Sequence, residues 1–127
     1  MRRNARENAF KLIFESLFHS VDKELSSENL EVLKKDDDNT FFEQIMNNFE
    51  EHKEEIKAKI EGNLKNFEYS RVFKIDLALI YLALTEILYV GTPRAVAINE
   101  VLELSKSYST EKSSKFINGI ISAIAKD

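Results

Sequence analysis

Residues 71–90 read "RVFKIDLALIYLALTEILYV", and this stretch decides the fold. Its side chains are apolar on nearly every side, which predicts a central helix surrounded by other helices. Gly91 is expected to end it, and Thr92 with Pro93 supplies an N-cap and a first helical residue for the next helix. The chain has only three Gly and one Pro among 127 residues. Strand-rich small domains need more turn residues, so we expect one all-α domain spanning residues 1–127.

Helical periodicity also predicts elements before the central helix. The first helix is expected to run from about Ala5 to His19, with Asn4 as its N-cap and Glu7 completing a capping box. A short and weaker helix is expected between about residues 25 and 33.

A long charged helix is expected next. Thr40 and Glu43 form a second capping box, which predicts where this helix begins. Gly62 or Asn63 is expected to end it.

Two further helices are expected after the central one. The first runs from Thr92 to about Tyr108, with Val96 among its buried residues. Ser109 or Thr110 is expected to cap the second.

The last helix contains an apparent contradiction, because Asn118-Gly119 is a turn signal inside an apolar helical pattern. We predict that both residues lie within the helix. Gly119 would let a neighbouring helix approach closely, and Asn118 would form a hydrogen bond across to a neighbour, near the helix that carries "AINE" at residues 97–100.

Composition excludes several classes of protein. The chain has no Cys, so disulfides, thiolate zinc sites and a cysteine nucleophile are excluded. His19 and His52 are isolated, and no phosphate-binding glycine loop or nucleophile elbow is present, so we expect neither an enzyme nor a metal or cofactor. The most apolar stretch contains Asp76 and Glu86 and is too short to span a bilayer. No signal peptide is visible, and the expected location is the cytoplasm.

The distribution of charge is uneven. The net charge of −4 argues against a simple nucleic-acid binder. Residues 22–61 hold 13 acids and six bases, however, and the segments on both sides are mildly basic. A local basic patch is therefore compatible with the acidic total.

Three arginines, Arg2, Arg3 and Arg6, lie at the predicted start of the first helix. Arginines at a helix N-terminus, where backbone amides are also free, suit contacts to backbone phosphates. A solvated N-terminus without a binding role is the alternative interpretation.

A second basic group lies at the start of the last helix, in "STEKSSKF" at residues 109–116. Lys112 and Lys115 stand beside several hydroxyls and Phe116, a combination that suits phosphates and a stacked base. The alternative is that Phe116 belongs to the core.

Asp76 is a lone acid near the start of the most apolar helix. Burying its carboxylate without a partner would cost on the order of several kcal/mol. We therefore expect it to lie at an edge, to cap a neighbouring helix, or to face a basic group on a partner. Glu86 and Glu100 pose the same question.

Three stretches together resemble one known family. They are "RRNARENAFKLIFE" at residues 2–15, "KIDLALIYLALTEILY" at residues 74–89 and "PRAVAINEVLELSKSYSTEKSSKFINGII" at residues 93–121. They are similar to the NusB transcription antitermination family, and "AINE" followed about 16 residues later by "KFING" is the most specific part. The resemblance implies a compact bundle of about seven helices, arranged as two roughly perpendicular three-helix groups.

The resemblance also implies a function. The family binds the boxA segment of ribosomal RNA operon leaders together with the ribosomal protein NusE. The pair joins an RNA polymerase complex that suppresses termination. A transcription antitermination factor with RNA, NusE and RNA polymerase as partners is therefore the expected function.

Residue roles follow from the same resemblance. RNA contacts are expected from Arg2, Arg3, Arg6, Lys112, Ser113, Lys115 and Phe116. Phe14 and Asp76 would face NusE, although Phe14 lacks the hydroxyl of the family's usual Tyr. The structural signature is carried by Asn99, Glu100, Asn118 and Gly119.

Two alternatives stay open. A helical protein-interaction module without direct RNA binding would also suit the acidic total and the small arginine group. Some ribosomal RNA cytosine methyltransferases carry a NusB-like domain, but this chain shows no cofactor-binding region and that interpretation would need a further chain.

Overall fold

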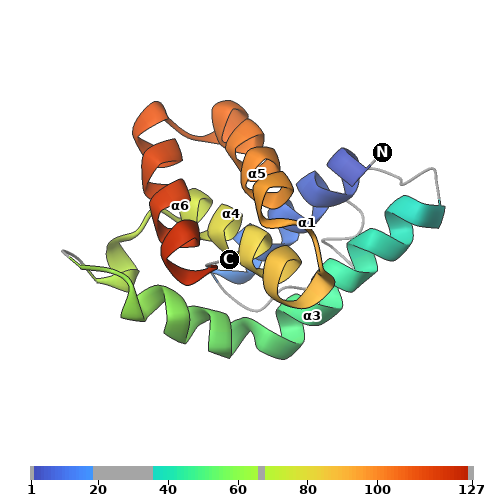
Figure 1. The fold of residues 1–127 in the computed structure, drawn as a ribbon, viewed down its shortest axis with the longest axis horizontal. Helices are drawn as coiled ribbons and strands as arrows, with labels where there is room; N and C mark the ends of the chain where they lie inside the picture. The colour runs from blue at the N-terminus through green and yellow to red at the C-terminus, as the bar shows by residue number, and fades with distance from the viewer. Residues whose placement is uncertain (1, 19–35, 66–67, 126–127) are drawn as a thin grey trace.

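The computed structural model describes residues 2–18, 36–65 and 68–125, and the described residues form a helical bundle (Figure 1). The elements are α1 (Arg2–Ser16), α3 (Asp36–Gly62), the 3-10 turn η1 (Tyr69–Arg71), α4 (Lys74–Thr85), the π-helical turn η2 (Glu86–Val90), α5 (Arg94–Tyr108) and α6 (Glu111–Ile124). The described part thus contains five α-helices, fewer than the seven that the resemblance implies. The short helix expected between residues 25 and 33 lies outside the described residues. No described helix is long and apolar enough to cross a membrane.

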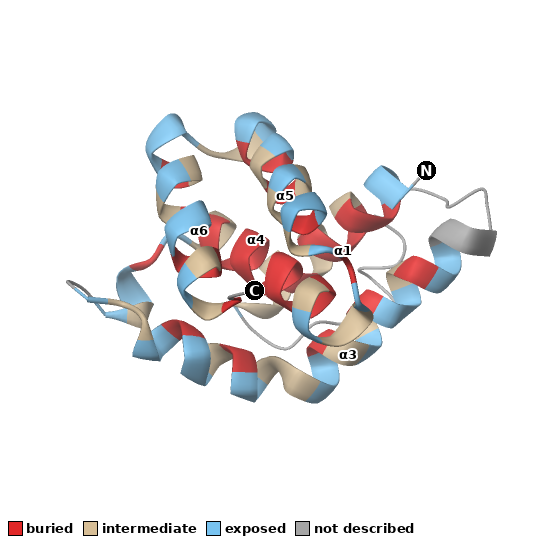
Figure 2. Cartoon of the chain, in the orientation of Figure 1, coloured by how far each residue is buried: buried red, intermediate tan, exposed pale blue. Residues whose placement is uncertain are grey.

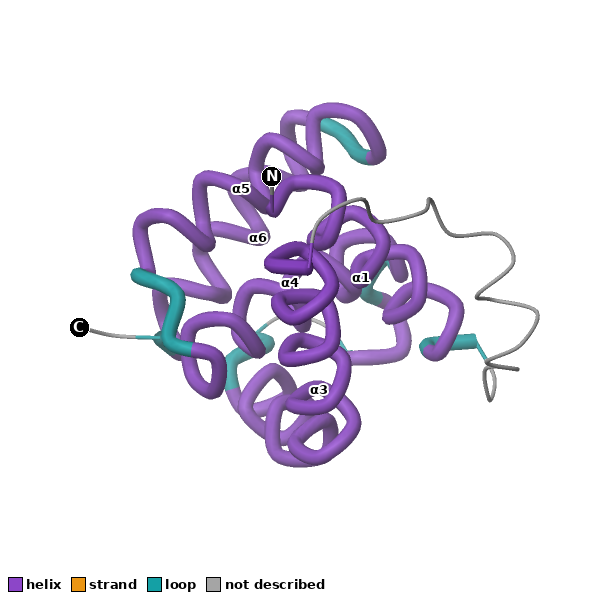
Figure 3. The backbone as a smooth tube through the Cα atoms, turned by 90° about the vertical axis from the view of Figure 1, so that its right-hand side faces the viewer, coloured by secondary structure: helices purple, strands orange, loops and turns teal. Residues whose placement is uncertain are grey.

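The predicted central helix is confirmed. Every residue from Asp76 to Thr85 in α4 is buried, and α1, α3, α5 and α6 all contact it (Figures 1 and 2). A helix that is apolar on all sides can bury its whole circumference only if neighbours surround it. Figure 3, turned by 90°, shows the same arrangement, with α4 inside and helices around it.

Both predicted capping boxes are wrong, because each helix begins earlier than expected. α1 starts at Arg2, so Asn4 and Glu7 lie inside the helix. α3 starts at Asp36, so Thr40 and Glu43 are also internal. Contacts between the two helices support the extra turn of α1, since the Arg2 guanidinium carbon lies 4.4 Å from the Phe41 ring centroid. The end of α3 at Gly62 is confirmed.

The corner between α4 and α5 contains the π-helical turn η2. Gly91, with φ of 98°, ends it as predicted, because that left-handed conformation favours glycine. The Gly91 and Thr92 amides donate to the Glu86 carbonyl at 2.9 and 3.0 Å. Thr92 is not the N-cap of α5, because its hydroxyl instead donates to Glu86 Oε1 at 3.0 Å, and α5 begins only at Arg94.

Two burial predictions on the outer helices are wrong. Val96 is 45% exposed, because it lies on the outer side of α5. Asn118 and Gly119 do lie within α6 as predicted, but both are exposed. A Cβ on Gly119 would meet nothing within 4 Å, and Asn118 Oδ1 accepts a hydrogen bond from Ser122 of the same helix. Neither residue therefore seats α6 against a neighbour.

Candidate nucleic-acid interface

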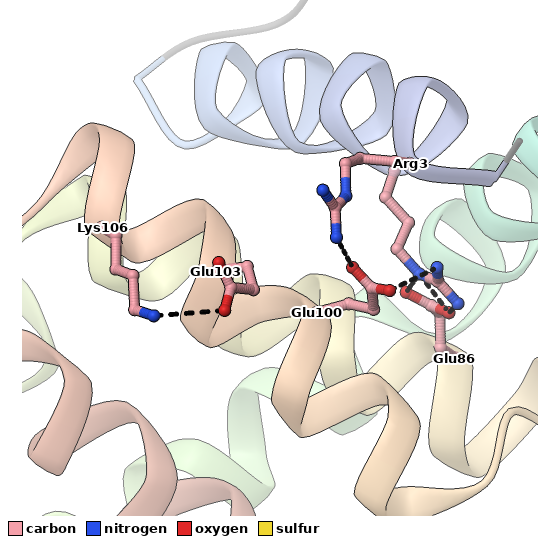
Figure 4. A network of polar contacts seen from close by, with 6 residues as sticks. Arg3, Glu86, Glu100, Glu103 and Lys106 are labelled. Atoms are coloured by element: carbon pink, nitrogen blue, oxygen red, sulfur yellow. Dashed lines mark hydrogen bonds and ion pairs between the residues drawn. The ribbon is translucent and has the colours of Figure 1, made fainter.

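The N-terminal arginines share one end of α1 but differ in their availability. Arg2 is exposed and stacks on Phe41 of α3. Arg3 is 64% exposed, and its Nη2 atom lies 3.5 Å from Oε2 of Glu100 on α5 (Figure 4). Both side chains can reach a ligand in solvent, although each already has an intramolecular contact.

Arg6 is buried, which contradicts its expected place on an RNA-facing surface. Its Nε atom donates to both carboxylate oxygens of Glu86 at 3.0 and 2.9 Å, and its Nη2 atom lies 2.9 Å from Oε1. The side chain of Arg6 is 5% exposed and that of Glu86 is 0% exposed. A buried carboxylate needs a paired cation, so we assign Arg6 to the core and not to a binding surface.

This pair also answers the question that Glu86 raised in the sequence. The two residues are 80 positions apart, and α1 must dock on α4 and η2 to bring them together. Thr92 completes the set of donors around the carboxylate. Arg6 Nη1 also lies 3.9 Å from Glu100 Oε1, so a single network links α1, η2 and α5 (Figure 4).

The start of α6 presents the second predicted surface. Thr110 is the N-cap, as expected, and its Oγ1 accepts from the Ser113 amide at 3.3 Å. Ser113 is buried, and its Oγ forms a hydrogen bond of 2.7 Å with Ser109 Oγ. This burial contradicts an RNA-facing role for Ser113, whose side chain is used within the cap. Lys112 and Lys115 are exposed, as a binding role requires.

Phe116 has features of both interpretations that the sequence left open. It is half-buried and packs against the hydrophobic core. It also lines a pocket of about 430 Å³ between the starts of α4 and α6, together with Arg71, Val72, Phe73, Asp76, Thr110, Lys112 and Ser113.

Two pocket residues, Arg71 and Phe73, were missed by the sequence interpretation. Phe73 is 72% exposed, more than any other large hydrophobic residue in the described part of the chain. It was counted with the apolar central helix, but α4 begins only at Lys74. Its position between Arg71 and Lys74 is the signal that could have separated it from the core.

The electrostatics of this surface differ from those of the N-terminal arginines. Within the described ranges, Arg71, Lys112 and Lys115 form no ion pair, whereas Arg3 and Arg6 both do. Such cations beside the exposed Phe73 ring and the half-buried Phe116 ring suit a nucleic-acid backbone and its bases.

Asp76 lies on the floor of the same pocket. It is 3% exposed and its Oδ1 accepts a hydrogen bond from Ser109 Oγ at 2.8 Å. Its place in the first turn of α4 favours a carboxylate, because the positive end of the helix dipole lies there. Asp76 therefore does not lie at an exposed edge, and its carboxylate instead accepts from Ser109, the residue that ends α5; the alternative of a basic group on a partner stays a prediction.

The remaining predicted residues lie apart from this pocket. Phe14 of α1 is half-buried, with its ring centroid 6.3 Å from that of Phe10 and 5.0 Å from that of Phe18. Phe18 is 57% exposed. Asn99 is exposed on α5, and Glu100 belongs to the arginine network.

These features define a class of protein: a small all-α protein with a surface suited to binding a partner. The described residues contain no group of three His, Cys, Asp or Glu that could hold a metal ion. The pocket between α4 and α6 gathers cations and aromatic rings, which suit contacts to an anionic polymer.

A model described as the NusB family matches residues 3–126, and the chain belongs to this family. It is 43% identical to the transcription antitermination protein NusB of Finegoldia magna, over 98% of this chain and 93% of that protein. It is 38% identical to the protein of the same name from Listeria innocua, over 99% and 97%. The family is one of antitermination factors and not of enzymes, as the sequence predicted.

Solved structures give the same assignment. T. maritima NusB superposes with a TM-score of 0.89 at 29% identity, covering 100% of this chain and 92% of that chain. A structure described as antitermination factors NusB and NusE in complex with dsRNA superposes with a TM-score of 0.86 at 26% identity, covering 98% and 96%. The all-α NusB-like fold is therefore confirmed.

Proposed function

We propose that this chain is an antitermination factor that binds boxA RNA of ribosomal RNA operon leaders together with ribosomal protein NusE. The pair acts in the cytoplasm within an RNA polymerase complex and suppresses termination. Support comes from family membership and from a solved relative that is described in complex with NusE and dsRNA. Residues 1–127 act as a single RNA-binding domain, with helices in two roughly perpendicular three-helix groups.

One observation carries the RNA-binding part of the proposal. The pocket between α4 and α6 combines two aromatic side chains with Arg71 and Lys112, two cations that form no ion pair with any described residue. An unstacked base contacts aromatic faces while nearby cations contact its phosphates. Lys115 and the exposed Arg2 and Arg3 extend the cationic contacts.

The partner explains how a chain of net charge −4 retains RNA. Few phosphate contacts give weak and salt-sensitive binding. A basic partner adds contacts on the same RNA, so the pair binds more tightly than either protein alone. Phe14 and Asp76 are the proposed NusE contacts. Because Asp76 is 3% exposed, a basic group of NusE would have to enter the pocket to reach it.

A gel-shift experiment tests this function. BoxA RNA and a scrambled RNA of equal length are titrated with the chain, with and without NusE. We expect a preference for boxA that NusE strengthens. Equal retention of both RNAs in the presence of NusE would refute the proposal.

Substitutions locate the surface. Lys112→Gln is expected to weaken RNA binding and to lower the salt slope by about 0.7, the value for one phosphate contact on a single strand. Lys59→Gln changes an exposed lysine of α3 that does not line the pocket and serves as the matched control. Equal binding by both variants would exclude Lys112 from the interface.

The aromatic contribution has its own pair of variants. Phe73→Ala is expected to lose roughly 1–3 kcal/mol of RNA binding, which is the range for one stacked base. Leu88→Ala is the control, since Leu88 is an exposed apolar residue of η2 outside the pocket.

The second candidate function is a protein-interaction module without direct RNA contact. It is favoured by the internal ion pairs of Arg3 and Arg6, which leave few N-terminal charges for RNA. If variants with reversed charge at Lys112 and Lys115 still assemble with the polymerase complex, this second function is supported. Loss of assembly in those variants, with the fold intact, would support direct RNA binding.

A further inference from the structure

Glu100 lies between two arginines and contacts each with a different oxygen (Figure 4). Oε2 lies 3.5 Å from Arg3 Nη2, and Oε1 lies 3.9 Å from Arg6 Nη1. Glu103, about one turn further along α5, instead pairs with Lys106 at 3.1 Å. Only the first of these two acids therefore touches the N-terminal arginines.

The two arginines are held with very different strength. Arg6 is buried and has three contacts of 2.9–3.0 Å to Glu86. Arg3 is 64% exposed, and among the described residues it pairs with Glu100 alone, at 3.5 Å. An exposed pair of this length is weak, so Arg3 can leave it readily. Glu100 would then still face Arg6, and no carboxylate would be left without a cation.

The charges of this network cancel, because two arginines face two glutamates. An approaching polyanion therefore meets a neutral cluster with one exposed guanidinium. We propose that Glu100 is an intramolecular competitor for RNA phosphate at Arg3, and that it sets the affinity of the N-terminal surface. This inference rests on the proposed RNA-binding function and concerns phosphate contacts of any sequence.

Removing the charge of Glu100 has two consequences for RNA. Arg3 no longer has to give up its ion pair with Glu100 in order to bind a phosphate. The carboxylate of Glu100 also no longer repels the incoming phosphate. Exposed charges at such distances interact weakly in water, so each effect is modest. Together they predict RNA binding that is about threefold to tenfold tighter in Glu100→Gln.

The experiment measures dissociation constants of boxA and scrambled RNA in the presence of NusE for a set of variants. Glu100→Gln is expected to tighten both RNAs by a similar factor. Glu103→Gln, which makes the same charge change on the same helix, is expected to stay within about twofold of the unmodified chain. In a chain that already carries Arg3→Gln, Glu100→Gln is expected to tighten RNA binding by less than half of the factor that it gives when Arg3 is present. Thermal unfolding tests whether each variant is folded. If Glu100→Gln is unstable, Glu100→Ala takes its place in the experiment.

Three results would overturn the inference: unchanged or weaker binding by Glu100→Gln, an equal gain from Glu103→Gln, or a full gain without Arg3. The boxA preference is a separate readout. If Glu100→Gln binds both RNAs more tightly but neither RNA is preferred, the proposed function is refuted and Glu100 is supported as competitor. If boxA is preferred but Glu100→Gln binds no more tightly, the proposed function is supported and the role of Glu100 is refuted.

Discussion

Replacing Arg6 with Met is expected to destabilise the fold severely, because it leaves a charged group unpaired in the core. Met keeps much of the apolar stem of Arg, so the substitution removes charge more than volume. Glu86, with a 0% exposed side chain, then keeps the Thr92 hydroxyl as a donor but loses its cation. Breaking a buried ion pair from one side costs about 3–5 kcal/mol.

That loss is a large fraction of the free energy of unfolding of a domain of this size, which is roughly 5–15 kcal/mol. With a urea m-value of about 2 kcal/mol/M, the unfolding midpoint is expected to fall by about 1.5–2.5 M. Equilibrium urea unfolding followed by far-UV circular dichroism measures this directly, because the described chain is helical.

Two comparisons separate the charge effect from packing. Glu86→Gln is expected to cost less than Arg6→Met, since Glu100 still lies 3.9 Å from the remaining guanidinium. Replacing both residues, as Arg6→Met with Glu86→Leu, is expected to recover most of the loss. A loss below about 1 kcal/mol in Arg6→Met, which is the value for exposed pairs, would refute the assignment of a buried pair.

Three further predictions concern single positions. Burial, with the hydrogen bond to Tyr69, raises the pKa of Tyr81. The protonated Tyr81 hydroxyl therefore contributes to the free energy of unfolding below about pH 10, and this contribution is lost as pH rises above that value. Urea titrations at several pH values should show that the free energy of unfolding falls less steeply at alkaline pH in Tyr81→Phe. Gly119→Ala is expected to raise the free energy of unfolding by about 0.5–1 kcal/mol, because the site is helical and open; a lower urea midpoint would contradict this. Thr110→Ala removes the cap on the Ser113 amide and is expected to cost about 0.5–2 kcal/mol in the same assay, whereas an unchanged midpoint would show that the cap contributes nothing.

The sequence predicted the features that depend on local pattern. The continuous apolar run places α4 at the centre, Gly91 ends the turn after it, and Thr110 caps α6. Helix starts were less predictable, because Asn4 and Thr40 resemble caps while tertiary contacts extend both helices beyond them.

The candidate site was predictable only where residues are neighbours in sequence. Lys112, Lys115 and Phe116 do gather at the start of α6. The burial of Arg6 was not predictable, since its partner lies 80 residues away and an arginine near a chain end is normally solvated. Phe73 was missed because its exposure depends on where α4 begins.

The π-helical turn η2 has a consequence for the alignment of related chains. A π-helical turn contains more residues than an α-helical turn of the same helix, and it behaves as a one-residue insertion accommodated within that helix. A relative with one residue fewer between Glu86 and Gly91 can therefore keep both helix ends and form a continuous α-helix there. An alignment gap in this segment marks a change of helix type, and Glu86 and Thr92 can still be matched on its two sides.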